Sequence, residues 1–153
     1  MGALLIVYHS QSGASARLAL AAQRGAAAEA EGGSTVRRLR AVDAGARELA
    51  AADALLLVCA ENSGRLAGAA KDFLDRVFYP LHGRGRVLPY ALLISAGNDG
   101  RNAAAEAQRI LRGIPFTEAL EPLIIRGLPD RAGEERAAEH AAGFAAGLAM
   151  GIF

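Results

Sequence analysis

Leu4-Leu5-Ile6-Val7-Tyr8-His9-Ser10-Gln11-Ser12-Gly13-Ala14-Ser15-Ala16-Arg17-Leu18 is the stretch that decides the fold. An apolar run passes directly into a hydroxyl-rich turn with one glycine, and a helical pattern follows. The hydroxyls of Ser10, Ser12 and Ser15 would stand beside the free N–H groups at the start of that helix, where the helix dipole favours an anion. We therefore interpret the turn as a phosphate-binding loop.

Strands and helices alternate along the rest of the chain. Apolar runs at 3–8 and 54–59 predict strands buried on both faces, the run at 87–95 predicts a fourth strand, and the more polar run at 35–40 predicts a strand near an edge. A fifth strand, interrupted at Pro122, is expected within 116–126. Helices are expected from the phosphate loop to about Glu31, over 44–51, from 66 to Pro80, up to about 112 and over 134–148. This order predicts a parallel sheet with helices on both faces and a ligand site at the carboxyl ends of the strands.

Length, charge and cysteine count argue against several classes of protein. The 153 residues are read as one domain, 1–153, and the net charge of +1 with no basic block beyond 37–40 argues against a nucleic-acid partner. The single cysteine, Cys59, excludes an internal disulfide. It also has no metal-ligand spacing with any histidine, so no metal site is expected. No uncharged run is long enough to span a bilayer, and Met1-Gly2-Ala3 leaves no room for a signal peptide, so a cytoplasmic protein is expected.

The first loop also excludes several nucleotide-binding classes. A triphosphate-binding loop needs a Gly-Lys-Ser/Thr ending, whereas this loop has Gly13-Ala14-Ser15. A dinucleotide fingerprint needs three glycines at fixed spacing, and only Gly13 is present. A receiver domain would need acidic residues where this chain has His9-Ser10 and Cys59-Ala60. The loop is therefore suited to a single phosphate group.

Three segments resemble the flavodoxin-like superfamily, and the similarity covers nearly the whole chain. Tyr8–Ser15 resembles its phosphate loop, with Ser15 where threonine is usual. Glu61–Arg76 resembles the glycine, then Gly-x-x-Lys-x-Phe-x-Asp, pattern of the NAD(P)H-dependent FMN reductases and quinone reductases, and Ser95–Asn102 resembles the flavin-edge loop of the same branch. The resemblance implies an α/β fold: a flavodoxin-like three-layer α/β/α sandwich with a five-stranded parallel sheet in the order 2-1-3-4-5.

The resemblance also implies which residues bind FMN. Five would hold the phosphate: Ser10, Ser12, Gly13, Ala14 and Ser15. Glu61, Asn62, Ser63 and Gly64 would flank the isoalloxazine ring, and Gly97, Asn98, Asp99 and Gly100 would approach its polar edge. Glycines let the backbone come close to a flat ring, and backbone N–H groups can stabilise charge on the reduced ring. The flavin would carry the chemistry, and no side chain is expected to be catalytic.

Two departures from the family bear on function. Many flavodoxins sandwich the ring between aromatic side chains on the second and third loops, whereas neither loop here contains Trp, Tyr or Phe. One-electron carriers of this fold also tend to be strongly acidic, and this chain is not. Both favour an oxidoreductase that takes hydride from NAD(P)H and passes electrons through FMN to a quinone, another flavin or a similar acceptor. The alternatives are a flavodoxin-like electron-transfer protein, with a redox partner protein and no turnover of its own, and a domain that has lost the flavin. Tyr79 or His82, from this chain or a partner subunit, could supply the missing ring contact.

Several residues also have simpler interpretations. Ser15 is a good helix N-cap, and Asp99 could cap the fourth helix or fix a turn. Arg65 and Arg101 could meet the phosphates of a nicotinamide nucleotide or only lie at the surface. Small residues on the last helix, including Gly147, could pack in the core or against a second subunit, and a homodimer or homotetramer is expected.

Overall fold

The computed structural model describes residues 2–30 and 33–153. Five strands run through the centre of the molecule: β1 (Ala3–Tyr8), β2 (Thr35–Arg40), β3 (Ala54–Asn62), β5 (Pro89–Ala96) and β6 (Thr117–Glu118), in the spatial order β2-β1-β3-β5-β6. Short β4 (Arg65–Leu66) pairs with β3, and β7 (Leu123–Arg126) pairs with β5. All pairs are parallel except β3 with β4. Because β6 and β7 are the two halves of the interrupted fifth strand, the order 2-1-3-4-5 is confirmed.

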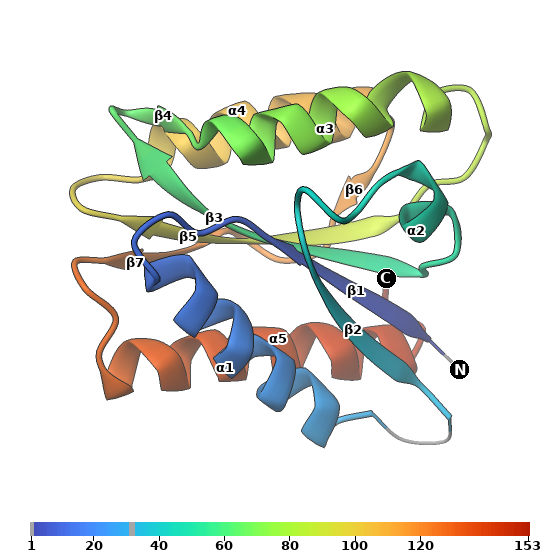
Figure 1. The fold of residues 1–153 in the computed structure, drawn as a ribbon. Helices are drawn as coiled ribbons and strands as arrows, with labels where there is room; N and C mark the ends of the chain where they lie inside the picture. The colour runs from blue at the N-terminus through green and yellow to red at the C-terminus, as the bar shows by residue number, and fades with distance from the viewer. Residues whose placement is uncertain (1, 31–32) are drawn as a thin grey trace.

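Helices cover both faces of the sheet (Figure 1). On one face lie α1 (Ala14–Ala28) and α5 (Arg131–Ala149), and on the other lie α2 (Ala46–Ala50), α3 (Gly68–Leu81) and α4 (Arg101–Gly113). The three-layer α/β/α arrangement expected from the sequence is therefore confirmed. None of these helices, nor any other in the described ranges, has the length and apolarity needed to cross a membrane.

The core divides into two apolar clusters because the central strands are buried on both faces. Along β3, Leu55 and Leu57 face α2, α3 and α4, while Leu56 and Val58 face α1 and α5. By contrast, β2 alternates exposed and partly buried residues at the sheet edge, as its sequence predicted. Long apolar runs mark the buried strands, and the mixed run marks the edge strand.

Small residues let α1 and α5 approach closely. A Cβ added at Gly25 would lie 2.1 Å from the Ala138 carbonyl oxygen, so only glycine fits at this crossing. A Cβ added at Gly147 would lie 2.1 Å from the ring of Phe153 in the same chain. Gly25 and Gly147 are therefore packed against other parts of the same chain.

Several element boundaries differ from the sequence-based expectations: α2 is shorter than 44–51, α3 begins at Gly68 instead of residue 66, and α5 begins at Arg131 instead of residue 134. Helix α1 ends at Ala28, before the expected end at Glu31, which lies outside the described residues. Pro80 lies inside the last turn of α3, which continues to Leu81. Strand β5 begins at Pro89 instead of residue 87. The largest difference concerns 60–64, expected to be a loop: β3 continues to Asn62 and turns back into β4, so this segment is a hairpin.

Candidate functional site

The carboxyl ends of β1, β3 and β5 bring the three predicted loops to one edge of the sheet. The first loop lies between β1 and α1, the hairpin tip between β3 and β4, and the third loop between β5 and α4. Asn62 Nδ2 donates to Gln11 Oε1 at 3.3 Å, which joins the hairpin to the first loop. The candidate site predicted from separate stretches of sequence is therefore one continuous region.

The first loop is shaped to receive an anion. Gly13, with φ of 100°, starts α1, and its N–H donates to Ser10 Oγ at 3.1 Å. No side chain caps the helix and its first turn contains no acidic residue. The N–H groups of that turn are therefore free to donate to a ligand, and the positive end of the helix dipole there favours an anion.

Ser15 is the strongest indication of a ligand in this loop. The residue is 2% exposed, and its Oγ has no hydrogen-bond partner in the described structure. A buried hydroxyl without a partner is rare, because its desolvation is not compensated. Ser15 lies in the first helical turn and Gly13 takes the cap position, so the interpretation of Ser15 as a simple N-cap is wrong. An oxyanion at the start of α1 would supply the acceptor that the hydroxyl lacks.

The second predicted segment is a tight hairpin, not a loop. Ser63 and Gly64 have φ values of 50° and 74°, so a two-residue turn with positive φ at both positions reverses the chain. Asn62, Ser63 and Gly64 are exposed and Glu61 is partly buried. Leu66 is 6% exposed and belongs to the core. The hairpin thus has an anchored base and an exposed tip, as a wall of a binding site would need.

The third loop is held by an ion-pair cluster. Asp99 Oδ1 lies 2.7 Å from Arg101 Nε and 3.7 Å from Arg126 Nη2. Gly97 and Asn98 are exposed, whereas Gly100 is buried and starts α4 with no side-chain cap. Asp99 therefore does not cap the helix. Arg126 was missed because it lies far along the chain, and only the pairing of β7 with β5 brings it to Asp99.

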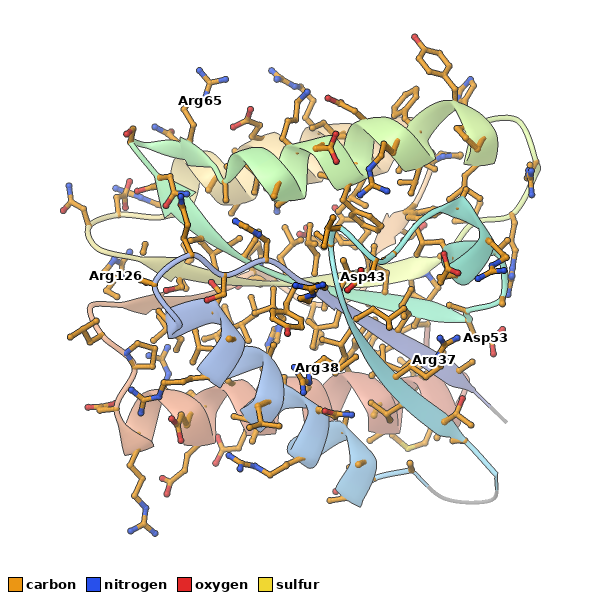
Figure 2. All side chains as sticks on the ribbon, viewed as in Figure 1. Arg37, Arg38, Asp43, Asp53, Arg65 and Arg126 are labelled. Atoms are coloured by element: carbon orange, nitrogen blue, oxygen red, sulfur yellow. The ribbon has the colours of Figure 1, made fainter. Side chains whose placement is uncertain are left out.

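Arginines surround this edge of the sheet (Figure 2). Figure 2 shows Arg65 and Arg126 on the side where the strands end, with Asp53 on the opposite side. Arg65 pairs with Glu106 and Arg101 pairs with Asp99, yet their side chains stay 70% and 78% exposed. Both retain access to solvent and to an incoming ligand.

An open hollow of about 440 Å³ lies beside the phosphate loop on its β2 side. Its lining joins Ser10 and Gly13 of the loop with Tyr8, Arg40 and Val42. The sequence did not predict this hollow, because Arg40 ends β2 and Val42 lies in the turn after it, whereas the first loop follows β1. There is thus open space next to the first loop.

Tyr79 and His82 cannot complete the site from within this chain. Both lie at the far end of α3, about 15–20 Å along the helix from the hairpin at 1.5 Å per residue. His82 stacks on Phe78 with a centroid distance of 5.5 Å. The expectation that they supply a ring contact from the same chain is wrong.

The remaining titratable candidates are structural. Cys59 is fully buried, and burial raises the pKa of its thiol to about 12, so it stays a neutral core residue. Lys71 and Asp75 form an exposed pair at 2.8 Å, and Arg76 pairs with Asp72 and also donates to the carbonyl oxygens of residues 41 and 44. Residues 2–30 and 33–153 contain no cluster of three or more His, Cys, Asp or Glu side chains that could hold a metal ion.

No protein-family model matches the sequence, and a search of the curated proteins finds no match. Solved structures are similar. The two-electron reduced flavodoxin from Megasphaera elsdenii is 22% identical, with a TM-score of 0.73 over 92% of this chain and 98% of that one. The flavodoxin, WrbA-like protein from Agrobacterium tumefaciens is 17% identical, with a TM-score of 0.73 over 95% and 96%.

A larger enzyme contains a similar domain. The rubredoxin oxygen:oxidoreductase from Desulfovibrio gigas is 16% identical, with a TM-score of 0.82 over 99% of this chain and 37% of that one. The fold and the strand-end site therefore define an α/β protein with the flavodoxin-like fold. At 16–22% identity, these structural similarities show the fold alone.

Proposed function

We propose that this protein binds FMN and transfers electrons through it. The observation that carries the proposal is the buried, unpartnered Ser15 Oγ at the uncapped start of α1. A phosphate monoester there would accept from that hydroxyl and from the free N–H groups of the first turn. The similar fold of flavodoxins supports FMN over other phosphate esters.

Different segments of the chain would bind different parts of FMN. Ser10, Ser12, Gly13, Ala14 and Ser15 would hold the phosphate, and the hairpin tip at Glu61–Gly64 would flank the ring. Gly97, Asn98, Asp99 and Gly100 would meet the ring's polar edge, where Arg101 and Arg126 keep positive charge beside Asp99. Bound FMN would supply the hydride and electron chemistry. The protein would bind, orient and electrostatically tune it.

We further propose NAD(P)H as the electron donor and a quinone, flavin or similar small molecule as the acceptor. The hairpin tip and the third loop contain no aromatic side chain, which leaves room for a nicotinamide to stack on the ring. Arg65 and Arg101 are exposed and could pair with its phosphates. A homodimer or homotetramer stays a prediction that size-exclusion chromatography would test.

FMN binding is tested by titration and by the introduction of one negative charge. The parent protein should acquire a bound flavin spectrum, and Ser12→Asp should weaken FMN binding at least about a hundredfold, because the new carboxylate repels the phosphate. Ala51→Asp adds the same charge at an exposed residue on the opposite edge and should bind like the parent. Parental affinity in Ser12→Asp would show that the phosphate is not bound there.

The electron donor is tested separately. Oxidation of NADPH or NADH in the presence of a quinone should depend on bound FMN. A yellow protein that oxidises neither nucleotide would be an electron carrier instead, and a protein that binds no flavin would contradict both functions.

A further inference from the structure

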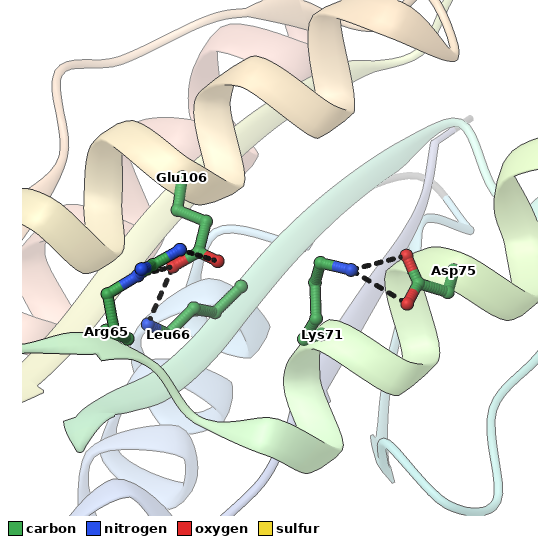
Figure 3. A network of polar contacts seen from close by, with 5 residues as sticks. All are labelled: Arg65, Leu66, Lys71, Asp75 and Glu106. Carbon is green, nitrogen blue, oxygen red and sulfur yellow. Dashed lines mark hydrogen bonds and ion pairs between the residues drawn. The ribbon is translucent and has the colours of Figure 1, made fainter. Parts of the chain in front are cut away.

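Glu106 of α4 ties down the β3–β4 hairpin (Figure 3). Its Oε2 accepts from the Leu66 N–H at 3.0 Å and from Arg65 Nε at 3.3 Å, and its Oε1 accepts from Arg65 Nη2 at 3.3 Å. The Glu106 side chain is 12% exposed. One largely buried carboxylate therefore receives three donors from the same two-residue strand.

The side of β4 that faces away from β3 lies against α4. Because alternate N–H groups of a strand point in opposite directions, Ala67 donates to the Ala60 carbonyl at 3.0 Å while Leu66 N–H points away from β3. No further strand pairs with β4 in the described sheet. Without Glu106, the N–H of a buried residue would have no acceptor, which is costly. Hydrogen bonds from Arg65 and Leu66 lower the pKa of Glu106, so the carboxylate is charged at neutral pH.

Glu106 also connects two parts of the candidate site. It lies on α4, the helix that begins directly after the third loop. The hairpin is also joined to the first loop by the exposed contact between Asn62 and Gln11, at 3.3 Å. Glu106 adds a part-buried hydrogen bond from the Leu66 N–H at 3.0 Å to its two exposed contacts with Arg65, and these contacts connect the hairpin to the helix that follows the third loop.

We infer that Glu106 is a positioning residue for the flavin. By holding β4 it sets the gap between the hairpin tip and the third loop, in which the isoalloxazine ring would lie. This inference rests on the proposed binding of FMN. Glu106 would contact no flavin atom, and its effect would reach the ring through the hairpin and leave the phosphate loop unchanged.

The experiment compares three variants with the parent protein. Glu106→Ala removes all three contacts, and Glu106→Gln keeps one acceptor for the Leu66 N–H. Asp75→Asn removes an exposed ion pair on α3 that does not touch the hairpin and serves as the control. FMN affinity, competition by inorganic phosphate, the visible spectrum of bound flavin and hydrogen exchange of the Leu66 amide without flavin are measured for each.

Glu106→Ala should exchange the Leu66 amide faster and bind FMN roughly tenfold more weakly, with a band shape closer to that of free FMN. Inorganic phosphate should compete at the parental concentration, because the first loop is intact. Glu106→Gln should recover part of the affinity, and Asp75→Asn should match the parent. Parental affinity and spectrum in both Glu106 variants would overturn the inference alone. Failure of the parent to bind FMN would overturn the proposed function and the inference together.

Discussion

Gly100 shows how much one residue constrains the third loop. Its φ is 79°, and an added Cβ would lie 2.7 Å from Ile124 Cγ2 and 3.0 Å from the Ala96 Cβ. Both the backbone conformation and the space require glycine here. Because the loop must return from β5 into α4 within a few residues, this position decides where Asp99 points.

Gly100→Ala is therefore expected to destabilise the protein by about 1–3 kcal/mol, from backbone strain and overpacking. Gly97→Ala, where nothing lies within 4 Å of the added Cβ, should change stability by less than about 0.5 kcal/mol. Urea unfolding of the two variants measures the difference. Equal stabilities would show that the loop rearranges to accept a side chain.

At the same scale, local spacing in the sequence was enough to propose which residues form the candidate site, but not which partners they contact. The hydroxyls and glycine of 10–15 stand close together in the sequence, so the proposed phosphate loop could be read directly and stays a prediction. The partners Arg126 and Glu106 could not be predicted, because each reaches its contact through strand pairing or helix packing between distant segments. Even Ser15 was ambiguous, because only the backbone of Gly13 shows which residue takes the cap position.

Helix packing supplies the element-scale prediction. Gly25→Ala should destabilise the protein by about 3 kcal/mol, because the new methyl group would press on the Ala138 carbonyl oxygen and force α1 and α5 apart. Gly143→Ala, on the exposed face of α5 with nothing within 4 Å, should stabilise it by about 0.5–1 kcal/mol through lower backbone entropy in the unfolded chain. Thermal unfolding of the two variants should shift in opposite directions, and shifts of the same sign would contradict this account.

Element types were predictable where apolar runs were long. Continuous apolar runs predicted β1, β3 and β5. Strands that are buried on both faces have apolar side chains at successive positions. The hairpin was missed since Ala60-Glu61-Asn62 has no β-branched residue and Ser63-Gly64 is typical of loops as well as of two-residue turns. The end of α3 was placed too early. Pro80 lies in the last turn, where few helical hydrogen bonds remain to be lost, so the helix continues past it to Leu81.

The free energy of unfolding of the protein should depend on pH through the protonation of His140. Burial lowers the pKa of this side chain below its usual 6.5, against a smaller opposing effect from the Leu92 backbone, and its Nε2 has no hydrogen-bond partner in the described structure. The unfolded chain therefore takes up the proton first as pH falls. The free energy of unfolding should decrease as pH drops below about 6.5.

Urea unfolding from about pH 8 to about pH 5 tests this, with His140→Gln as the comparison. The stability difference between parent and variant should shift against the parent as pH falls. A difference that stays constant over this range would show that His140 titrates equally in the folded and unfolded chains.

The break in the fifth strand has a consequence for the length of the chain. The chain leaves the sheet after Glu118, returns at Leu123, and pairs with β5 on both sides of the gap. Each half keeps its own hydrogen bonds, and Glu121 between them is exposed. Residues inserted after Glu121 would lengthen only the connection, so this point should accept a foreign peptide or reporter domain while the sheet and its strand-end site remain intact.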